Sequence, residues 1–232
     1  MPELASSRWP EISDGPRRLL VVPLGSLEQH GPHLPMDTDT RIATAVAARA
    51  CSGIPGIGLA PAVAIGASGE HADFPGTLSI GTGALTTVLV ELGRHASLHW
   101  PAMLLVNGHG GNVPAIRSAI QTLRPEGREC HVWHASLPEA APGVPADPHA
   151  GRFETSVMLA LAPSQVRLEA SAAGDARPLR EIMPDLMSRG VRAVSPNGVL
   201  GDPAGASAAE GARLVERLVS GLRATVEGLA GR

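Results

Sequence analysis

The segment RLLVVPLGSLEQHGPHLPMDTD, residues 18–39, joins a continuous apolar run to a polar loop. Its first part, Arg18–Leu24, ends at Gly25 and is typical of a strand covered on both faces of a sheet. Further apolar runs predict strands at Gly58–Ile65, Ala102–Val106 and Glu129–His134. Segments with helical periodicity alternate with these runs, at Thr38–Arg49, Ala84–His99, Pro114–Leu123, Arg152–Leu161 and Ala204–Leu229.

This alternation of strands and helices predicts an α/β fold in which a mostly parallel central sheet carries helices on both faces. We expect residues 1–232 to form one domain, since the length suits a single α/β unit. Pro138–Pro148 reads as a Pro/Ala loop. Residues 164–197 leave several interpretations open: a short edge strand, a Pro-interrupted helix near Arg180–Ser188, and a turn.

The composition excludes several classes of protein. The net charge is −3 and charged residues make up 18%, which disfavours disorder and gives nucleic acid no basic surface. No apolar stretch reaches 18 residues, so we expect no membrane span, and the N-terminal residues lack the apolar core of a signal peptide. We therefore expect a cytoplasmic protein in which Cys51 and Cys130 are buried, reduced thiols.

Loop 25–39 concentrates side chains that bind metals. It holds Glu28, His30, His33, Asp37 and Asp39 directly after a predicted strand. In parallel sheets, ligands bind at the carboxyl ends of the strands. Carboxylates and imidazoles that converge there would form a divalent-metal site, and without Cys the chemistry favours Zn²⁺, Mn²⁺ or Fe²⁺. The structural alternative is a polar surface loop that caps the next helix.

Two later motifs also hold potential metal-binding or catalytic side chains. VNGHGGN, residues 106–112, places His109 in a Gly-rich turn after a predicted strand. HAGRFETS, residues 149–156, places His149 just before a helix and Glu154 in its first turns. Taken alone, the first is also compatible with an ordinary turn. An acidic residue near a helix N-terminus is likewise favourable without any function.

Five ordered motifs resemble the creatininase family of metal-dependent amidohydrolases: GSLEQHGPHLPMDTD, GEHADFPGTLSI, NGHGGN, HAGRFETS and GVLGDP. The resemblance implies a three-layer α/β/α hydrolase with two divalent metal ions per subunit, assembled as a homo-oligomer such as a hexamer or octamer. Its metal ligands fall on Glu28 and His30, on a bridging Asp39, and on His109. Its catalytic histidine, which passes a proton to the leaving nitrogen, falls on His149.

Two positions depart from the family member that hydrolyses creatinine. That enzyme has a glutamate ligand where this chain has Gly111, and we expect Glu154 to supply the missing carboxylate. It also has a tyrosine at the position of Gly110 and tryptophans over its substrate, whereas this chain has no Tyr and offers only the remote Trp133. Creatinine is therefore disfavoured as the substrate.

Within the family, the chain is most similar to peptidases that release a Val-Tyr-derived dipeptide from the C-terminus of a modified precursor peptide. The hypothesis is hydrolysis of an amide bond by a hydroxide held between the two metal ions. The alternatives are hydrolysis of a small cyclic amide or formamide, and a non-enzymatic metal-binding subunit. Substrate contacts are predicted from loops that reach the same sheet edge, at His33, Glu70, His71, Phe74, Gly110 and Gly111.

Overall fold

The computed structural model describes residues 3–135 and 147–231 and contains a four-stranded parallel sheet. The strands are β1 (Leu19–Leu24), β2 (Ile57–Leu59), β3 (Ala102–Asn107) and β4 (Glu129–His134), in the spatial order β2-β1-β3-β4. The longer helices are α2 (Thr38–Cys51), α3 (Gly81–Ala96), α4 (Val113–Leu123), α5 (Arg152–Leu161), α6 (Leu179–Arg189) and α8 (Ala208–Ala230). Two short helices, α1 and α7, cover Trp9–Ser13 and Val191–Val194.

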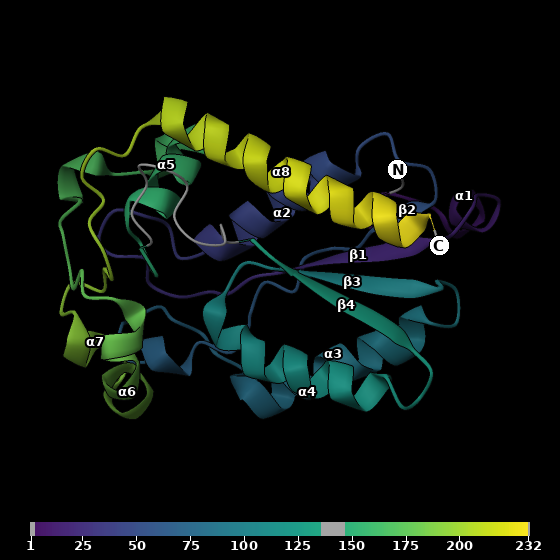
Figure 1. The fold of residues 1–232 in the computed structure, drawn as a ribbon, viewed down its shortest axis with the longest axis horizontal. Coiled ribbons are helices and arrows are strands. Elements are labelled where there is room, and N and C mark those ends of the chain that lie inside the picture. The colour runs from purple at the N-terminus through teal and green to yellow at the C-terminus, as the bar shows by residue number, and fades with distance from the viewer. Residues whose placement is uncertain (1–2, 136–146, 232) are drawn as a thin grey trace.

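Helices cover both faces of this sheet, as the alternation of elements predicts (Figure 1). In β1 every side chain is buried, and successive side chains enter opposite layers. Leu19 and Val21 join the cluster beneath α2, α5 and α8, whereas Leu20 and Val22 join the cluster beneath α3 and α4. The continuous apolar run of β1 therefore reflects two cores, one on each face, and the three-layer α/β/α prediction is confirmed.

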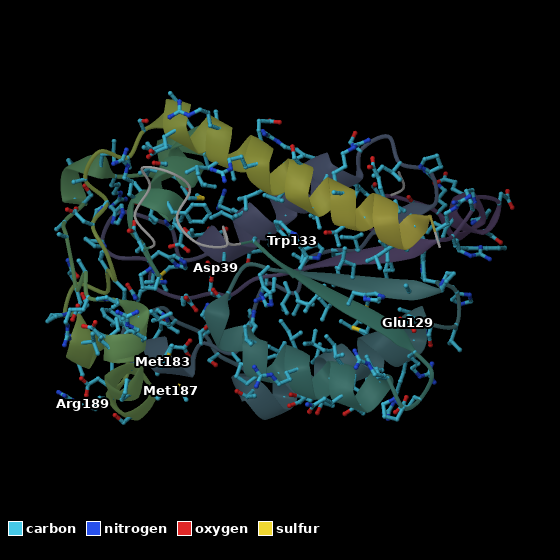
Figure 2. The ribbon with its side chains drawn as sticks, in the orientation of Figure 1. Asp39, Glu129, Trp133, Met183, Met187 and Arg189 are labelled. Atoms are coloured by element: carbon cyan, nitrogen blue, oxygen red, sulfur yellow. The ribbon has the colours of Figure 1, made fainter. Side chains whose placement is uncertain are left out.

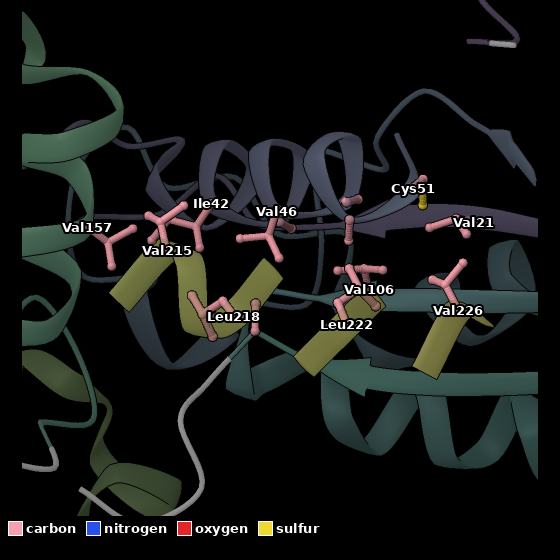
Figure 3. Close-up of a cluster of buried hydrophobic side chains, with 14 of the residues drawn as sticks. Val21, Ile42, Val46, Cys51, Val106, Val157, Val215, Leu218, Leu222 and Val226 are labelled. Atoms are coloured by element: carbon pink, nitrogen blue, oxygen red, sulfur yellow. The ribbon is translucent and has the colours of Figure 1, made fainter. Parts of the chain in front are cut away.

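The core under α8 is built from regularly spaced aliphatic residues (Figure 3). Leu214, Leu218 and Leu222 lie four residues apart and are at most 2% exposed, so one face of the helix packs on the sheet. Val46 of α2 and Val106 of β3 belong to the same cluster. This packing fixes α2 and α8 against the strands and thereby positions the first turn of α2.

Three regions differ from the sequence predictions. Strand β2 ends at Leu59 instead of continuing to Ile65, because Pro61 lacks the N–H that a ladder requires. Residues 164–197 contain helices and turns and no edge strand; Ile182, Leu186 and Val191 form a small separate core there. The loop predicted at 138–148 lies almost entirely outside the described residues. Among the described residues, no helix has the length and apolarity required to cross a bilayer.

The carboxyl ends of β1 and β3 lie side by side, because Leu24 is in register with Asn107 and accepts a hydrogen bond from the N–H of Gly108. Figure 2 shows Asp39 at this edge of the sheet and Glu129, the first residue of β4, at the opposite edge. The loops after β1 and β3 therefore deliver their side chains to one place. This edge carries the candidate site.

Candidate metal centre

Imidazole and carboxylate side chains from three segments meet at the carboxyl edge of the sheet. Glu28 and His30 come from the loop after β1, Asp39 from the first turn of α2, and His109 from the turn after β3. All four are at most 6% exposed. Buried ionisable groups of this kind are rare unless they pair with one another or bind a metal. The structure thus brings together the four residues that the sequence singles out first.

Asp39 lies at the middle of this cluster, and its two carboxylate oxygens face different imidazoles. Its Oδ1 lies 3.0 Å from Nε2 of His30, and its Oδ2 lies 3.2 Å from Nδ1 of His109. The hydroxyl of Ser26 donates a 2.7 Å hydrogen bond to Oδ2 and fixes the orientation of the carboxylate. Each oxygen of Asp39 is therefore presented to a separate group of potential ligands.

The first group consists of Glu28, Asp39 and His109, whose ligand atoms lie within 4.8 Å of one another. Oε2 of Glu28 approaches Nε2 of His109 at 3.1 Å, yet within the described part of the chain both Glu28 oxygens are buried without a hydrogen bond. An uncompensated buried carboxylate is costly. A bound divalent cation would satisfy these oxygens, and carboxylate and imidazole ligands suit Zn²⁺, Mn²⁺ or Fe²⁺.

The second group consists of His30, His149 and Glu154, whose ligand atoms also lie within 4.8 Å of one another. The rings of His30 and His149 have centroids 4.4 Å apart. Oε2 of Glu154 accepts a 2.5 Å hydrogen bond from the N–H of Ala150, a residue in the left-handed backbone region with φ of 53°. That unusual backbone turns the segment after His149 so that His149 and Glu154 face the same space.

The two groups perturb one another electrostatically. Burial disfavours the charged form of His30, but the adjacent carboxylate of Asp39 outweighs burial and raises the pKa of His30 to about 10. Burial raises the pKa of Glu154 to about 7. Burial and the neighbouring imidazoles hold the pKa of His149 well below its ordinary value, so His149 is neutral near pH 7.

The residues predicted to contact substrate fall into two sets, and the first borders the metal centre. Nε2 of His71 lies 3.3 Å from Oε1 of Glu28, and Oε1 of Glu70 lies 3.4 Å from Nε2 of His109. Gly111 packs so closely under these groups that a Cβ would collide with Glu70 and His109. Gly110 is exposed, with open space where a side chain would project.

His33 and Phe74 form the second set and have other partners. Nε2 of His33 lies 2.9 Å from Oγ1 of Thr155, and burial lowers the pKa of His33 to about 4. Phe74 packs against the small core around Ile182, with the guanidinium of Arg192 5.7 Å from its ring centroid. These contacts hold the loops in place, and neither residue belongs to the two candidate ligand groups.

Sequence reasoning missed two residues of the site. Ser26, which orients Asp39, is not among the predicted site residues. Gln29 lies between two predicted ligands, and its amide contacts both His71 and His149. Its position inside the EQH motif was the available signal. Local spacing alone does not reveal partners that lie 42 and 120 residues away.

The fold and the site define a class: an α/β/α protein whose sheet edge presents paired carboxylate–imidazole groups suited to metal-dependent hydrolysis. The sequence matches the creatininase family, described as creatinine amidohydrolase, over residues 5–226. The chain therefore belongs to the creatininase family, whose members are hydrolases of C–N bonds.

Among curated relatives, a mycofactocin precursor peptide peptidase from Mycolicibacterium smegmatis is 50% identical over 208 residues, covering 88% of this chain and 82% of that protein. A creatinine amidohydrolase from Pseudomonas putida is 34% identical over 179 residues, covering 65% of this chain and 67% of that enzyme.

Solved creatininase structures share the fold over nearly the whole chain. A mutant creatininase of Zn–Zn type has a TM-score of 0.79 and 27% identity and covers 98% of both chains. A manganese creatininase has a TM-score of 0.77 and 28% identity and covers 97% of both chains. The structural relatives thus include zinc and manganese proteins, and this chain carries a candidate metal site at its sheet edge.

Proposed function

We propose that this chain is a metal-dependent peptidase that cleaves the modified mycofactocin precursor peptide and releases its C-terminal Val-Tyr-derived dipeptide. The 50% identity to a peptidase of that name supports the substrate. The observation that carries the chemistry is Asp39, because its two oxygens face His30 and His109 separately. A carboxylate so placed can serve two cations at once.

In this proposal, Asp39 would be a ligand of both of two divalent ions. Glu28 and His109 would hold one ion, and His30 and Glu154 would hold the other. Zn²⁺, Mn²⁺ and Fe²⁺ all suit these ligands. When bound, such ions activate water and polarise the scissile carbonyl. Glu28 fits its assignment because its buried oxygens lack hydrogen bonds in the described structure.

His149 would move the proton that hydrolysis requires. Its Nε2 lies 2.8 Å from the backbone carbonyl oxygen of Gln29, which can only accept a hydrogen bond. Nε2 therefore carries the proton and Nδ1 presents its lone pair, with Oε1 of Glu28 3.7 Å away. A neutral imidazole with a free Nδ1 can take a proton from the attacking water and deliver it to the leaving amide nitrogen.

The surroundings of the site favour a peptide over a small planar ring. Gly110 faces open space where the creatinine enzyme has a tyrosine. Trp133 packs with the core under α8 and belongs to neither candidate ligand group. The chain has no Tyr to replace them. Among the described residues, the two ligand groups include no aromatic side chain other than histidine, which fits an extended peptide better than an enclosed planar ring.

The direct test is to incubate the purified protein with the modified precursor peptide and follow release of the dipeptide by mass spectrometry. We expect release with added Zn²⁺ or Mn²⁺ and none after chelation. Creatinine and a formamide are assayed in parallel. Turnover of either without peptide cleavage would instead support the small-amide alternative. No turnover of any substrate by the metal-loaded protein would support a non-enzymatic role.

We also propose a cytoplasmic location, and a homo-oligomer, a hexamer or octamer, as the family resemblance implies. A candidate contact surface comprises exposed apolar residues of α3 and the loop before it, namely Leu78, Ile80, Val88 and Leu92. Exposed apolar side chains that cluster in this way mark protein contacts. Mass measurement by light scattering tests the assembly, and a monomeric mass would contradict it.

A further inference from the structure

Gln29 belongs to the first of the five motifs, and its side-chain amide contacts three of the other four. Its Nε2 lies 2.9 Å from Nδ1 of His71, 3.1 Å from Nε2 of His149 and 3.1 Å from the carbonyl oxygen of Gly198. Its Oε1 accepts a 2.8 Å hydrogen bond from the N–H of Gly31, which fixes which end of the amide faces the imidazoles. Gln29 is only 6% exposed, so water does not compete for these contacts.

The hydrogen bonds around Gln29 fix the tautomers of both histidines. Nε2 of His149 must carry a proton, because it contacts the backbone carbonyl oxygen of Gln29 at 2.8 Å. That nitrogen therefore has no free lone pair for the Gln29 amide. The two amide hydrogens of Gln29 then have two acceptors, the carbonyl oxygen of Gly198 and Nδ1 of His71. Both amide hydrogens of Gln29 find acceptors only in this arrangement.

The assignment leaves His71 with its proton on Nε2, the nitrogen 3.3 Å from Oε1 of Glu28. In this state the Nε2–H of His71 faces Oε1 of Glu28 without completing a hydrogen bond in the described structure. A metal-ligating nitrogen needs a free lone pair, so Nε2 of His71 is not available as a ligand. His71 is therefore not assigned as a ligand, although Glu28, His71 and His149 lie close enough together to form a third candidate ligand group.

The backbone at Gly198 is shaped for this amide. Gly198 has a φ of +80°, a conformation that favours glycine, and a Cβ at this position would overlap the side chain of Gln29. Its carbonyl is thereby free to accept from Nε2 of Gln29. Gly198 begins the GVLGDP motif, so this contact gives that motif a role in the site.

We propose that Gln29 is a positioning residue of the hydrolase site: its amide holds His71 as the Nε2–H tautomer, which keeps a polarised N–H facing Oε1 of Glu28 at 3.3 Å. The inference deepens the proposed function and rests on it only for the effect on turnover. The carbonyl of the same residue keeps Nδ1 of His149 free of a proton. One residue thus sets one imidazole as a donor and the other as a base.

The experiment is ¹⁵N NMR of the full chain, loaded with Zn²⁺ and labelled at histidine, because nitrogen shifts distinguish protonated, bare and metal-bound positions. We expect a bare Nδ1 and protonated Nε2 at His71, and a protonated Nε2 at His149. A protonated Nδ1 with a zinc-shifted Nε2 at His71 would make His71 a ligand and overturn the proposal. This measurement needs no variant and no substrate.

Two variants extend the test. Gln29→Met keeps the volume but removes the amide, and Gln29→Glu replaces the donor to His71 with an acceptor. We expect a mixture of His71 tautomers in Gln29→Met, a reversed His71 tautomer in Gln29→Glu, and an unchanged His149 in both. We also expect kcat to fall ~10–100-fold with KM within about twofold and zinc content retained. Gln121→Met, on the exposed face of α4, is the matched control.

Unchanged His71 tautomer and kcat in both variants would overturn the proposal. If the wild-type protein cleaves no peptide but its tautomers are as assigned, the proposed function is wrong and the positioning role stands. If it cleaves the peptide but His71 binds zinc, the positioning role is wrong and the proposed function stands.

Discussion

The two halves of the candidate metal centre are built in different ways. The sheet half, Glu28, Asp39 and His109, comes from loops that directly follow β1 and β3 and from the first turn of α2. The α5 half draws only His30 from that region and takes His149 and Glu154 from the segment that enters α5. The first half is thus formed by the sheet itself, whereas the second depends on how α5 docks.

Contacts remote from the sheet secure the α5 half. The backbone of His149 pairs with that of Leu200 through two hydrogen bonds, of 3.3 Å and 2.9 Å. Asp147 accepts hydrogen bonds from the first N–H groups of α5 and so caps the helix. Arg152 makes a two-pronged ion pair with the buried Glu210 of α8, at 2.9 Å for both contacts. The α5 half is therefore complete only when the C-terminal helix is in place.

The largest effect is expected where the two halves join. Asp39→Ala removes the carboxylate that both halves share, so we expect loss of both cations and of detectable peptide cleavage. Elemental analysis of the purified variant, together with the cleavage assay, measures this. A variant that retains its metal and its activity would show that Asp39 does not bridge the halves.

A second prediction separates proton transfer from metal binding within the α5 half. His149→Ala removes the free Nδ1 while leaving the assigned ligands, so we expect kcat to fall by roughly 10²–10⁴-fold with metal content retained. Steady-state kinetics and elemental analysis check this. Loss of one cation in this variant would reassign His149 as a ligand.

A third prediction distinguishes the halves by stoichiometry. Glu154→Gln removes a ligand from the α5 half only, and Glu28→Gln removes one from the sheet half only. We expect each variant to lose one cation and keep the other, with Glu169→Gln, an exposed site, as control. Loss of both cations from either variant would mean that the halves bind metal cooperatively rather than as separable sites.

The smallest effect concerns pH. In the metal-free protein the pKa of His30 is raised to about 10, so His30 is protonated at neutral pH. A cation in the α5 half must displace that proton, so its affinity should rise by about tenfold per pH unit between about 7 and 10, and more steeply below about 7, where Glu154 also carries a proton. Calorimetry in buffers of different ionisation enthalpy counts the protons. Binding without proton release would contradict the assignment of His30.

The sequence was sufficient to predict the sheet half of the candidate site, but it predicted the remaining fold only in part. Strands β1 and β3 are continuous apolar runs, and Glu28, His30, Asp39 and His109 follow them closely, so the parallel-sheet rule alone brings them together. The end of β2 depends on Pro61, and the arrangement of residues 164–197 depends on a small separate core. Neither leaves a periodic signal in the sequence.

The residues that orient the site were harder to find for a related reason. Ser26 and Gln29 carry no charge, and their function lies in contacts with residues distant in the chain. A motif identifies groups with distinctive chemistry, whereas an amide or hydroxyl shows its role only when its partners are placed. Tertiary structure was therefore necessary to find them.

The most direct test of the account is the anomalous scattering of a crystal of the zinc-loaded protein, measured at the zinc edge. We expect two peaks per chain, one beside Glu28 and His109 and the other beside His30 and Glu154, with one oxygen of Asp39 next to each. A single peak would contradict the two-ion proposal. Two peaks with Asp39 next to only one of them, or to neither, would contradict the bridging role of Asp39.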